Sequence, residues 1–153
     1  MLKVVLQEGL DRENAAAVCR WTNQRDADFL LQWAGPEMLF PLSVETVQGL
    51  SNVHSIFLED EFAGMIQRIR TENNNVHIGR FLVDPARTGK GIGKKALSAF
   101  IRLIFSDPSV HSISLSVLAQ NVGAMGLYEK LGFEVAESIE HLQRKIIMKR
   151  ARQ

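Results

Sequence analysis

Apolar and polar positions along this chain form short runs whose period switches between two and about 3.6 residues. Runs with period two predict strands, and clusters of acidic or asparagine residues between them predict turns, at Glu59-Asp60-Glu61 and Asn73-Asn74-Asn75. The predicted strands cover residues 2–7, 54–58, 62–71, 76–83 and 112–117, with a closing antiparallel pair at 133–139 and 143–149. The strict alternation from Ser112 to Val117 predicts a half-exposed strand.

Runs with the longer period predict helices at residues 11–21, 26–33, 91–105 and 121–131, and a short helix from Ser43 to Gly49. Asp11 or Asn14 is the predicted N-cap of the first helix, and Gly35-Pro36 ends the second. The helix at 91–105 places an apolar stripe against the sheet: Ile92, Ala96, Ala99, Phe100 and Leu103. No repeat or linker interrupts the chain, so we expect a single α/β domain over residues 1–153.

Composition fits one globular domain of 153 residues, 46% of them hydrophobic and 23% charged. A net charge of +1 gives no electrostatic case for binding nucleic acid, and the basic C-terminal segment is read as a solvated terminus. The start lacks a signal-peptide pattern and no 18-residue apolar run occurs, so we expect a cytoplasmic protein that does not bind membranes. The one cysteine, Cys19, is expected to be a buried apolar residue. No metal site is expected.

A glycine-rich turn, Arg87-Thr88-Gly89-Lys90-Gly91-Ile92-Gly93, connects a predicted strand to a predicted helix. Alternating glycines allow a tight turn and close approach of a ligand, so that successive N–H groups converge on an anion. The positive end of the following helix adds to these donors. The turn is therefore predicted to hold phosphate oxygens, although many glycine-rich turns bind nothing.

Two other phosphate-binding patterns do not fit this turn. The G-x-x-x-x-G-K-[ST] loop needs Gly at Thr88 and Ser or Thr at Lys95. The dinucleotide fingerprint can be placed on Gly91, Gly93 and Ala96, but no acidic residue follows at the required distance. These mismatches disfavour an ATP- or NAD-dependent enzyme.

A second motif lies downstream, Asn121-Val122-Gly123-Ala124-Met125-Gly126-Leu127-Tyr128-Glu129-Lys130-Leu131-Gly132-Phe133. Together the two motifs resemble the GNAT family of N-acetyltransferases over roughly residues 76–150. The resemblance implies a GNAT fold: a central mixed, twisted sheet of about six to seven strands with helices on both faces. In that fold the parallel fourth and fifth strands splay apart, and the pantetheine arm of acetyl-CoA inserts between them.

The resemblance also implies acetyl-CoA as the cofactor and a set of residues that bind it. The family pattern [QR]-x-x-G-x-[GA] falls on residues 88–93, where Thr88 replaces the usual Gln or Arg and Arg87 lies one residue upstream. Asn121 is expected to cap its helix as well as to contact the cofactor. The expected cofactor-binding residues are Leu82, Val83, Arg87, Thr88, Gly89, Lys90, Gly91, Ile92, Gly93, Lys94, Asn121, Ala124, Tyr128 and Lys130. For the lysines, an ordinary surface position is the alternative.

Acetyl transfer to an amine needs an oxyanion donor, an acid for the thiolate and a path for the amine proton. The resemblance implies a backbone N–H near Leu82 or Val83 for the oxyanion and Tyr128 for the acid, since a phenol stays protonated at neutral pH. A tyrosine that only packs beneath the sheet is the alternative. His77 is the candidate base. Glu59, Glu61 or Glu72 acting through water, or a water relay alone, remain open.

The acceptor site is expected in the N-terminal half, at Trp33-Ala34-Gly35-Pro36-Glu37-Met38-Leu39-Phe40-Pro41. Trp33 and Phe40 are candidates for an apolar wall, and Glu37 for a partner of a cationic amine; core packing of Trp33 and Phe40 is the alternative. A peptide, an aminoglycoside, a polyamine and an amino acid all remain open as acceptors. We expect an N-acetyltransferase that is a monomer or a homodimer. The alternative is a CoA-binding sensor with the same fold.

Overall fold

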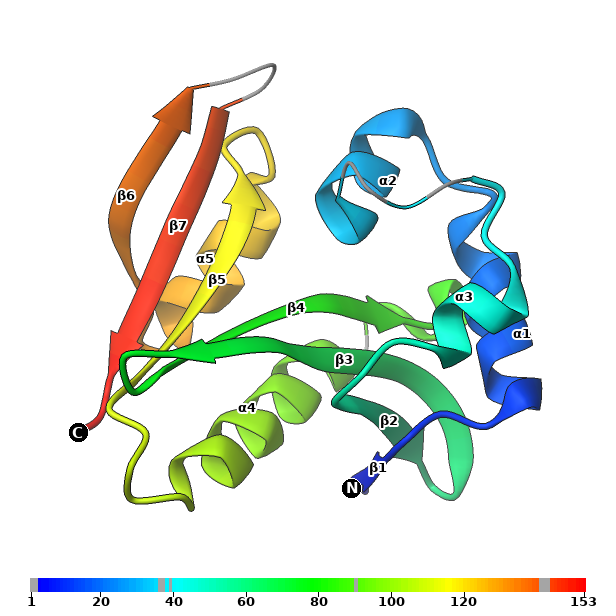
Figure 1. Ribbon diagram of the computed structural model, residues 1–153, viewed down its shortest axis with the longest axis horizontal. Helices are drawn as coiled ribbons and strands as arrows, with labels where there is room; N and C mark the ends of the chain where they lie inside the picture. Colours follow the sequence, from blue (N-terminus) through cyan, green and yellow to red (C-terminus); the bar gives the residue numbers. More distant parts are fainter. Residues whose placement is uncertain (1–2, 36–37, 39, 90, 141–143) are drawn as a thin grey trace.

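The computed structural model describes residues 3–35, 38, 40–89, 91–140 and 144–153 (Figure 1). The helices are α1 (Arg12–Thr22), α2 (Ala27–Ala34), α3 (Val44–Gln48), α4 (Ile92–Phe105) and α5 (Val122–Lys130), with a 3-10 turn at Pro85–Arg87. The strands are β1 (Val4–Glu8), β2 (Val53–Leu58), β3 (Glu61–Glu72), β4 (Asn75–Val83), β5 (Ser112–Leu118), β6 (Glu134–Glu140) and β7 (Arg144–Ala151).

The strands form one mixed sheet in the order β1-β2-β3-β4-β5-β7-β6, in which only the β4–β5 pairing is parallel among the described strands. Side chains cap the N-termini of the first three helices. Asp11, Asp26 and Ser43 each accept a hydrogen bond from a backbone N–H and cap α1, α2 and α3. The turns between β2 and β3 and between β3 and β4 have positive φ at Glu59, Asp60, Asn73 and Asn74, as tight two-residue turns require.

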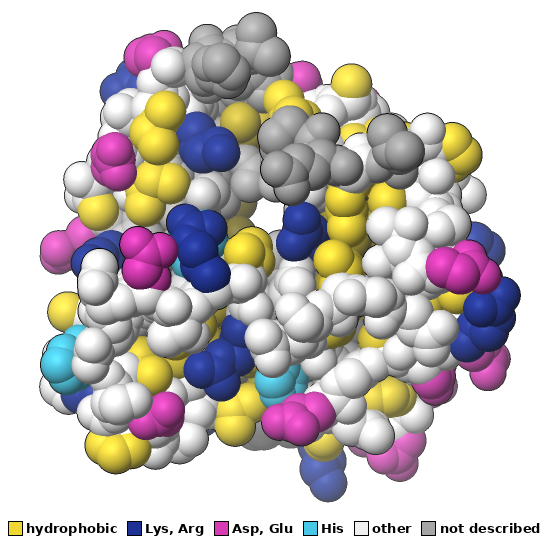
Figure 2. All heavy atoms as spheres, viewed as in Figure 1, with side chains coloured by type: hydrophobic (Ala, Val, Ile, Leu, Met, Phe, Trp, Pro, Cys, Tyr) yellow, Lys and Arg dark blue, Asp and Glu magenta, His cyan; other side chains and the backbone are white. Residues whose placement is uncertain are grey.

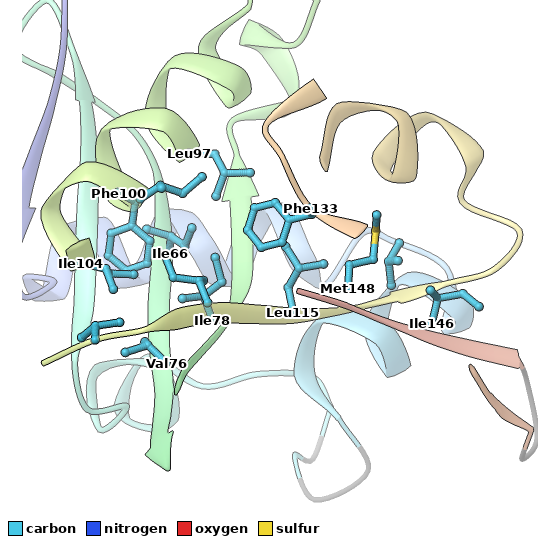
Figure 3. Close-up of a cluster of buried hydrophobic side chains, with 14 residues drawn as sticks. Ile66, Val76, Ile78, Leu97, Phe100, Ile104, Leu115, Phe133, Ile146 and Met148 are labelled. Atoms are coloured by element: carbon cyan, nitrogen blue, oxygen red, sulfur yellow. The ribbon is translucent and has the colours of Figure 1, made fainter. Parts of the chain in front are cut away.

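Helices cover both faces of the sheet, which confirms the predicted fold class (Figure 1). On one face α4 and α5 pack on β4, β5 and β7 around Phe100, Phe133 and Met148 (Figure 3). On the other face α1, α2 and α3 pack on β2 and β3 around Val18, Trp33 and Met65. A third cluster of buried residues, Ile56, Leu58, Ala63, Ile92 and Ala96, joins α4 to β2 and β3. The described residues thus build buried cores on both faces of the sheet.

Two details of the sequence prediction are wrong. The serine side of β5 is not exposed, because Ser112 and Ser114 are buried and hydrogen-bonded to side chains of β4. The stripe of α4 is rotated, since Leu103 is 41% exposed and the buried residues are Ile92, Ala96, Leu97, Phe100, Ile101 and Ile104. Two adjacent apolar stripes fit the helical period of this segment, and the sheet selects the one that includes Leu97 and Ile104.

Candidate active site

The gap between β4 and β5 is the central feature of the site. The two strands pair over three positions, the last joining His77 to Ser114, and beyond this vertex they diverge (Figure 1). A parallel sheet interior normally has every backbone group paired, so the diverging edges leave N–H and C=O groups available. The diverging edges therefore suit a ligand that can pair with an extended backbone.

The alternation of hydrogen-bonded and non-hydrogen-bonded pairs between β3 and β4 determines which backbone groups of β4 face the gap. Asp84 donates its N–H to the Ala63 carbonyl over 2.7 Å, so these two residues form a hydrogen-bonded pair of the antiparallel ladder. The next pair, Gly64–Val83, is then non-hydrogen-bonded, and the N–H and C=O of Val83 point away from β3 and toward the gap. Leu82, opposite Met65, faces β3 instead.

The glycine-rich turn leads from the end of β4 into α4. Gly89 and Gly91 adopt φ values of +83° and +73°, a conformation that favours glycine. Gly91 is the N-cap of α4, and within the described residues no capping side chain accepts a hydrogen bond at this N-terminus. The N–H groups of the first helical turn are therefore left for another acceptor, which suits an anion.

The side chains of the glycine-rich turn offer fewer groups for binding an anion than its backbone does. Arg87 is paired with Glu61 and with Asp84, and the hydrogen bond to Glu61 raises the pKa of its guanidinium. Thr88 donates its hydroxyl to the Pro85 carbonyl over 3.2 Å. Lys94 is exposed in the first turn of α4, whereas Ile92 is buried in the core. Lys90 lies outside the described residues.

Helix α5 holds the second motif beside β5. The side chain of Asn121 accepts a hydrogen bond from the Ala124 N–H over 3.2 Å, which confirms the predicted cap. Tyr128 packs against the core, with its ring edge-on to Phe133 at 6.1 Å between centroids. Burial raises the pKa of the Tyr128 phenol, so the hydroxyl keeps its proton. Lys130 is exposed at the end of α5.

His77 lies at the vertex, within a network of small polar side chains. Its Nδ1 is 2.7 Å from the Ser114 hydroxyl, and its Nε2 is 3.4 Å from the Ser116 hydroxyl. Asn75 donates its side-chain amide to Ser114 over 2.8 Å and accepts from Ser112 over 2.8 Å. Burial, together with the charges of Arg70 and Lys145, lowers the pKa of His77 to about 4. The imidazole is therefore neutral at physiological pH.

Arg80 lies beside the gap and is absent from the residues predicted for the site. It occupies a bulge of β4, where Arg80 and Phe81 together face Ile66, and has a φ of +46°, rare for a residue with a side chain. Its guanidinium donates to the Gln67 side chain over 2.7 Å and to the Ala34 carbonyl at the end of α2 over 2.8 Å. An arginine beside Gly79 within an apolar strand was the available signal.

Helix α2 is held to both sides of the gap. Arg80 binds its C-terminal end from β4, and Gln32 donates its side-chain amide to the Ser116 carbonyl of β5 over 3.0 Å. The buried Gln32 Oε1, Trp33 Nε1 and Arg80 Nε have no hydrogen-bond partner within the described residues. These orphaned polar atoms gather where α2 meets the strands, which is unusual for a finished core.

The residues predicted for the acceptor site do not lie together in one site. Trp33 is 5% exposed and belongs to the core between α1, α2 and β3. Phe40 is 36% exposed, and Glu37 lies outside the described residues. The described part of the chain contains no group of three or more His, Cys, Asp or Glu side chains that could hold a metal ion.

Comparison with known proteins places this arrangement in a family. The model of the acetyltransferase (GNAT) family matches residues 13–133, which is most of the chain. The chain belongs to the GNAT family. Solved GNAT-like structures agree in fold: AAC(6')-Ib with ribostamycin and coenzyme A has a TM-score of 0.76 at 23% identity, covering 98% of this chain and 94% of that one. A GNAT acetyltransferase from Bacillus anthracis has a TM-score of 0.77 at 18% identity, covering 97% and 95%.

Curated relatives match a shorter part of this GNAT chain. The spermine/spermidine N(1)-acetyltransferase of Bacillus subtilis (strain 168) is 32% identical over 78 residues, 51% of each chain. The aminoglycoside N(6')-acetyltransferase type 1 of Klebsiella pneumoniae is 39% identical over 57 residues, 37% of this chain and 28% of the relative. The first match thus spans about half the length of the relative. None of the described helices is long and apolar enough to cross a membrane.

Proposed function

We propose that this GNAT chain is an N-acetyltransferase that moves an acetyl group from acetyl-CoA to a primary amine in a ternary complex. The observation that carries the proposal is the gap between β4 and β5, which leads directly to a glycine-rich turn and an uncapped helix N-terminus. A ligand with an extended, amide-bearing arm and a phosphate end fits that sequence of features. The curated relatives, both named as N-acetyltransferases, support the same reaction.

The residues that would hold acetyl-CoA fall into three groups. Backbone groups of Val83 would pair with the pantetheine arm, and the turn at 88–93 with the first turn of α4 would bind the pyrophosphate. Asn121, Ala124 and Lys130 of α5 would line the other side. Arg87 is already paired with two carboxylates, so the backbone carries more of the phosphate binding than this side chain. When bound, acetyl-CoA supplies the acetyl group as a thioester.

The chain's own groups supply polarisation and protons. The N–H of Val83 faces the gap and is our candidate donor to the oxyanion, in preference to Leu82. Tyr128 donates its phenolic proton to the departing sulfur, since burial keeps the phenol protonated.

His77 is the candidate group for the amine proton. Its lowered pKa keeps the imidazole neutral and able to accept a proton, but also makes it a weak base. We propose that it relays the proton through Ser116 and water rather than holding it. A relay of this kind leaves no titration of His77 in the pH–rate profile near neutrality.

The relatives are named for polyamine and aminoglycoside acceptors. For this chain we propose only what these acceptors share, a primary amine. Trp33 and Phe40 remain proposed as acceptor contacts, although the burial of Trp33 favours a role in the core. We propose a monomer or homodimer acting in the cytoplasm, on acceptors other than nucleic acid or membranes.

Two measurements test the proposed function. The first is the thermal midpoint with acetyl-CoA, CoA, ATP or NAD, where a ligand at about 100 times its Kd adds roughly 2.7 kcal/mol. We expect a rise with acetyl-CoA and CoA alone. The second is release of free thiol from acetyl-CoA over a panel of amines. Binding without release for every amine would identify a CoA sensor instead, and a rise with ATP or NAD would refute the cofactor.

A further inference from the structure

A row of facing side chains crosses the sheet at the vertex of the gap. Arg70 of β3 stands opposite His77 of β4, and His77 stands opposite Ser114 of β5. Ser114 in turn stands opposite Lys149 of β7. Facing residues on neighbouring strands project to the same side of a sheet, so Arg70 lies beside His77, and Lys149 beside Ser114, on the face opposite α4.

Neither cation takes part in an ion pair within the described residues, although Glu134 stands opposite Lys149. Over the part of the chain that the structure describes, no carboxylate oxygen lies within 4.0 Å of a charged nitrogen of Arg70, Lys145 or Lys149. Arg70 and Lys149 line a pocket of about 250 Å³ together with Asn73, Asn75 and one acid, Glu72. The pocket thus presents two cations, one carboxylate and the amide of Asn73 to a ligand, together with the amide of Asn75, which also bonds Ser112 and Ser114.

The wider surroundings hold charges of both signs. Arg70 and Lys145 are the charges that act on His77, and both lower its pKa. The nearest acids of this face beyond Glu72 are Glu134 and Glu137, which stand opposite Lys149 and Ile147 on the edge strand β6. Figure 2 shows a hollow between strands β5 and β7 on one side and helix α2 on the other, and Lys and Arg side chains lie on several sides of it.

The cations near His77 have two effects on an acceptor amine. They disfavour its ammonium form, which helps to produce the neutral nucleophile. They also repel every further positive charge on the acceptor, so a polycation gains no binding energy here. Free Arg and Lys side chains form strong, charge-assisted hydrogen bonds with carboxylates and phosphates. An anionic acceptor thus gains what a polycation loses.

Resting on the proposed acetyltransferase function, we infer that the acceptor is a primary amine that also carries an anionic group, a carboxylate or a phosphate. That group is held by Arg70 and Lys149 beside the vertex, with Lys145 adding to the attraction. The amine end lies further along β4, toward the gap. The pocket is a specificity site for the acceptor and takes no part in the chemical step.

The test compares acceptors that share one amine and one spacer and differ at the far end. Hexylamine, 1,6-diaminohexane, 6-aminohexanoate and 6-aminohexyl phosphate provide neutral, cationic, carboxylate and phosphate ends, and longer homologues extend the spacer. We expect kcat/KM for one of the two anionic series to exceed that for the diamine series by at least about tenfold, or 1.4 kcal/mol. The better anionic series identifies the group. Equal or better use of the diamines would overturn the inference while leaving the acetyltransferase function intact.

Variants locate the effect. Arg70→Gln and Lys149→Gln should each remove most of the preference for the anionic acceptor, by raising its KM with little change in kcat. Arg102→Gln removes the same charge from α4, which covers the opposite face, and should keep the preference. Calorimetry of the anionic amine with the CoA-saturated protein gives a readout independent of turnover. Retained preference in both variants would overturn the assignment, and acetyl-CoA binding without acetylation of any amine would overturn the proposed function as well.

Discussion

The two sides of the gap are built in different ways. On the cofactor side, from β4 through α5, the backbone provides the features that matter: an unpaired strand edge, two glycines with positive φ and an uncapped helix. On the acceptor side, α2 is positioned by side chains that reach across the gap, Gln32 to β5 and Arg80 from β4. Backbone features tolerate many side chains, whereas the acceptor side depends on particular ones. Substitutions should therefore separate the two sides.

Tyr128→Phe is the sharpest test on the cofactor side. Loss of the hydroxyl should lower kcat about 100-fold, because the thiolate then leaves without an acid, while the ring still packs on Phe133. Acetyl-CoA affinity, measured by calorimetry, should stay within about twofold. An unchanged kcat would assign Tyr128 to packing alone.

Gly64→Ala tests whether the backbone of β4 carries the cofactor site. A Cβ at Gly64 would lie 2.0 Å from the Leu82 carbonyl oxygen, so β4 must shift. We expect a loss of about 2–3 kcal/mol in the free energy of unfolding, and weaker acetyl-CoA binding. Gly79→Ala is the matched control, because its Cβ meets only the tip of the Ile69 side chain at 2.5 Å, which can rotate away. Similar losses in both variants would contradict the argument.

His77→Gln tests the vertex through stability. In the unfolded chain the imidazole titrates near 6.5, and in the folded chain at about 4. Between these values the unfolded chain binds more protons, so this residue destabilises the fold as the pH falls. At about pH 4.5 it should cost about 2 kcal/mol relative to neutral pH, and His77→Gln should remove that part of the acid sensitivity in urea unfolding.

The same variant tests the proton relay. If His77 only relays protons, kcat falls in His77→Gln while the shape of the profile near neutrality is kept. Loss of an acidic limb above about pH 5.5 in the variant would instead identify His77 as the titrating base.

Arg80→Met has the smallest expected effect on stability and tests the acceptor side. The variant leaves the Ala34 carbonyl and the Gln67 side chain without their donor, at a cost of about 1–2 kcal/mol. Because α2 loses its tie to β4, the KM of the acceptor should rise while the Kd of acetyl-CoA stays the same. A weaker acetyl-CoA Kd with an unchanged acceptor KM would reverse the assignment of Arg80.

This contrast also explains what the sequence could predict. Glycines, caps and periodicity act locally, so the sequence predicts the turn at 87–93, the cap Asn121, a cap at Asp11 or Asn14 and the two hairpins of β2, β3 and β4. The insertion of β7 between β5 and β6 is non-local and was not predicted. The burial of Ser112 and Ser114 was not predicted either, because it depends on Asn75 and His77, which lie more than 30 residues away in the sequence. The link from Arg80 to Ala34 is equally non-local.

The position of the gap also has a consequence for self-association. An unpaired strand edge on the outside of a sheet invites pairing with another chain. Here the outer edges are protected against pairing with another chain. Strand β1 has only five residues, and β6 carries Glu134, Glu137 and Glu140 along a fully exposed strand. The unguarded edges of β4 and β5 lie inside the molecule, flanked by α2 and α4. Only a single extended chain is narrow enough to reach these edges. The fold can therefore keep an unpaired strand edge without the usual risk of aggregation.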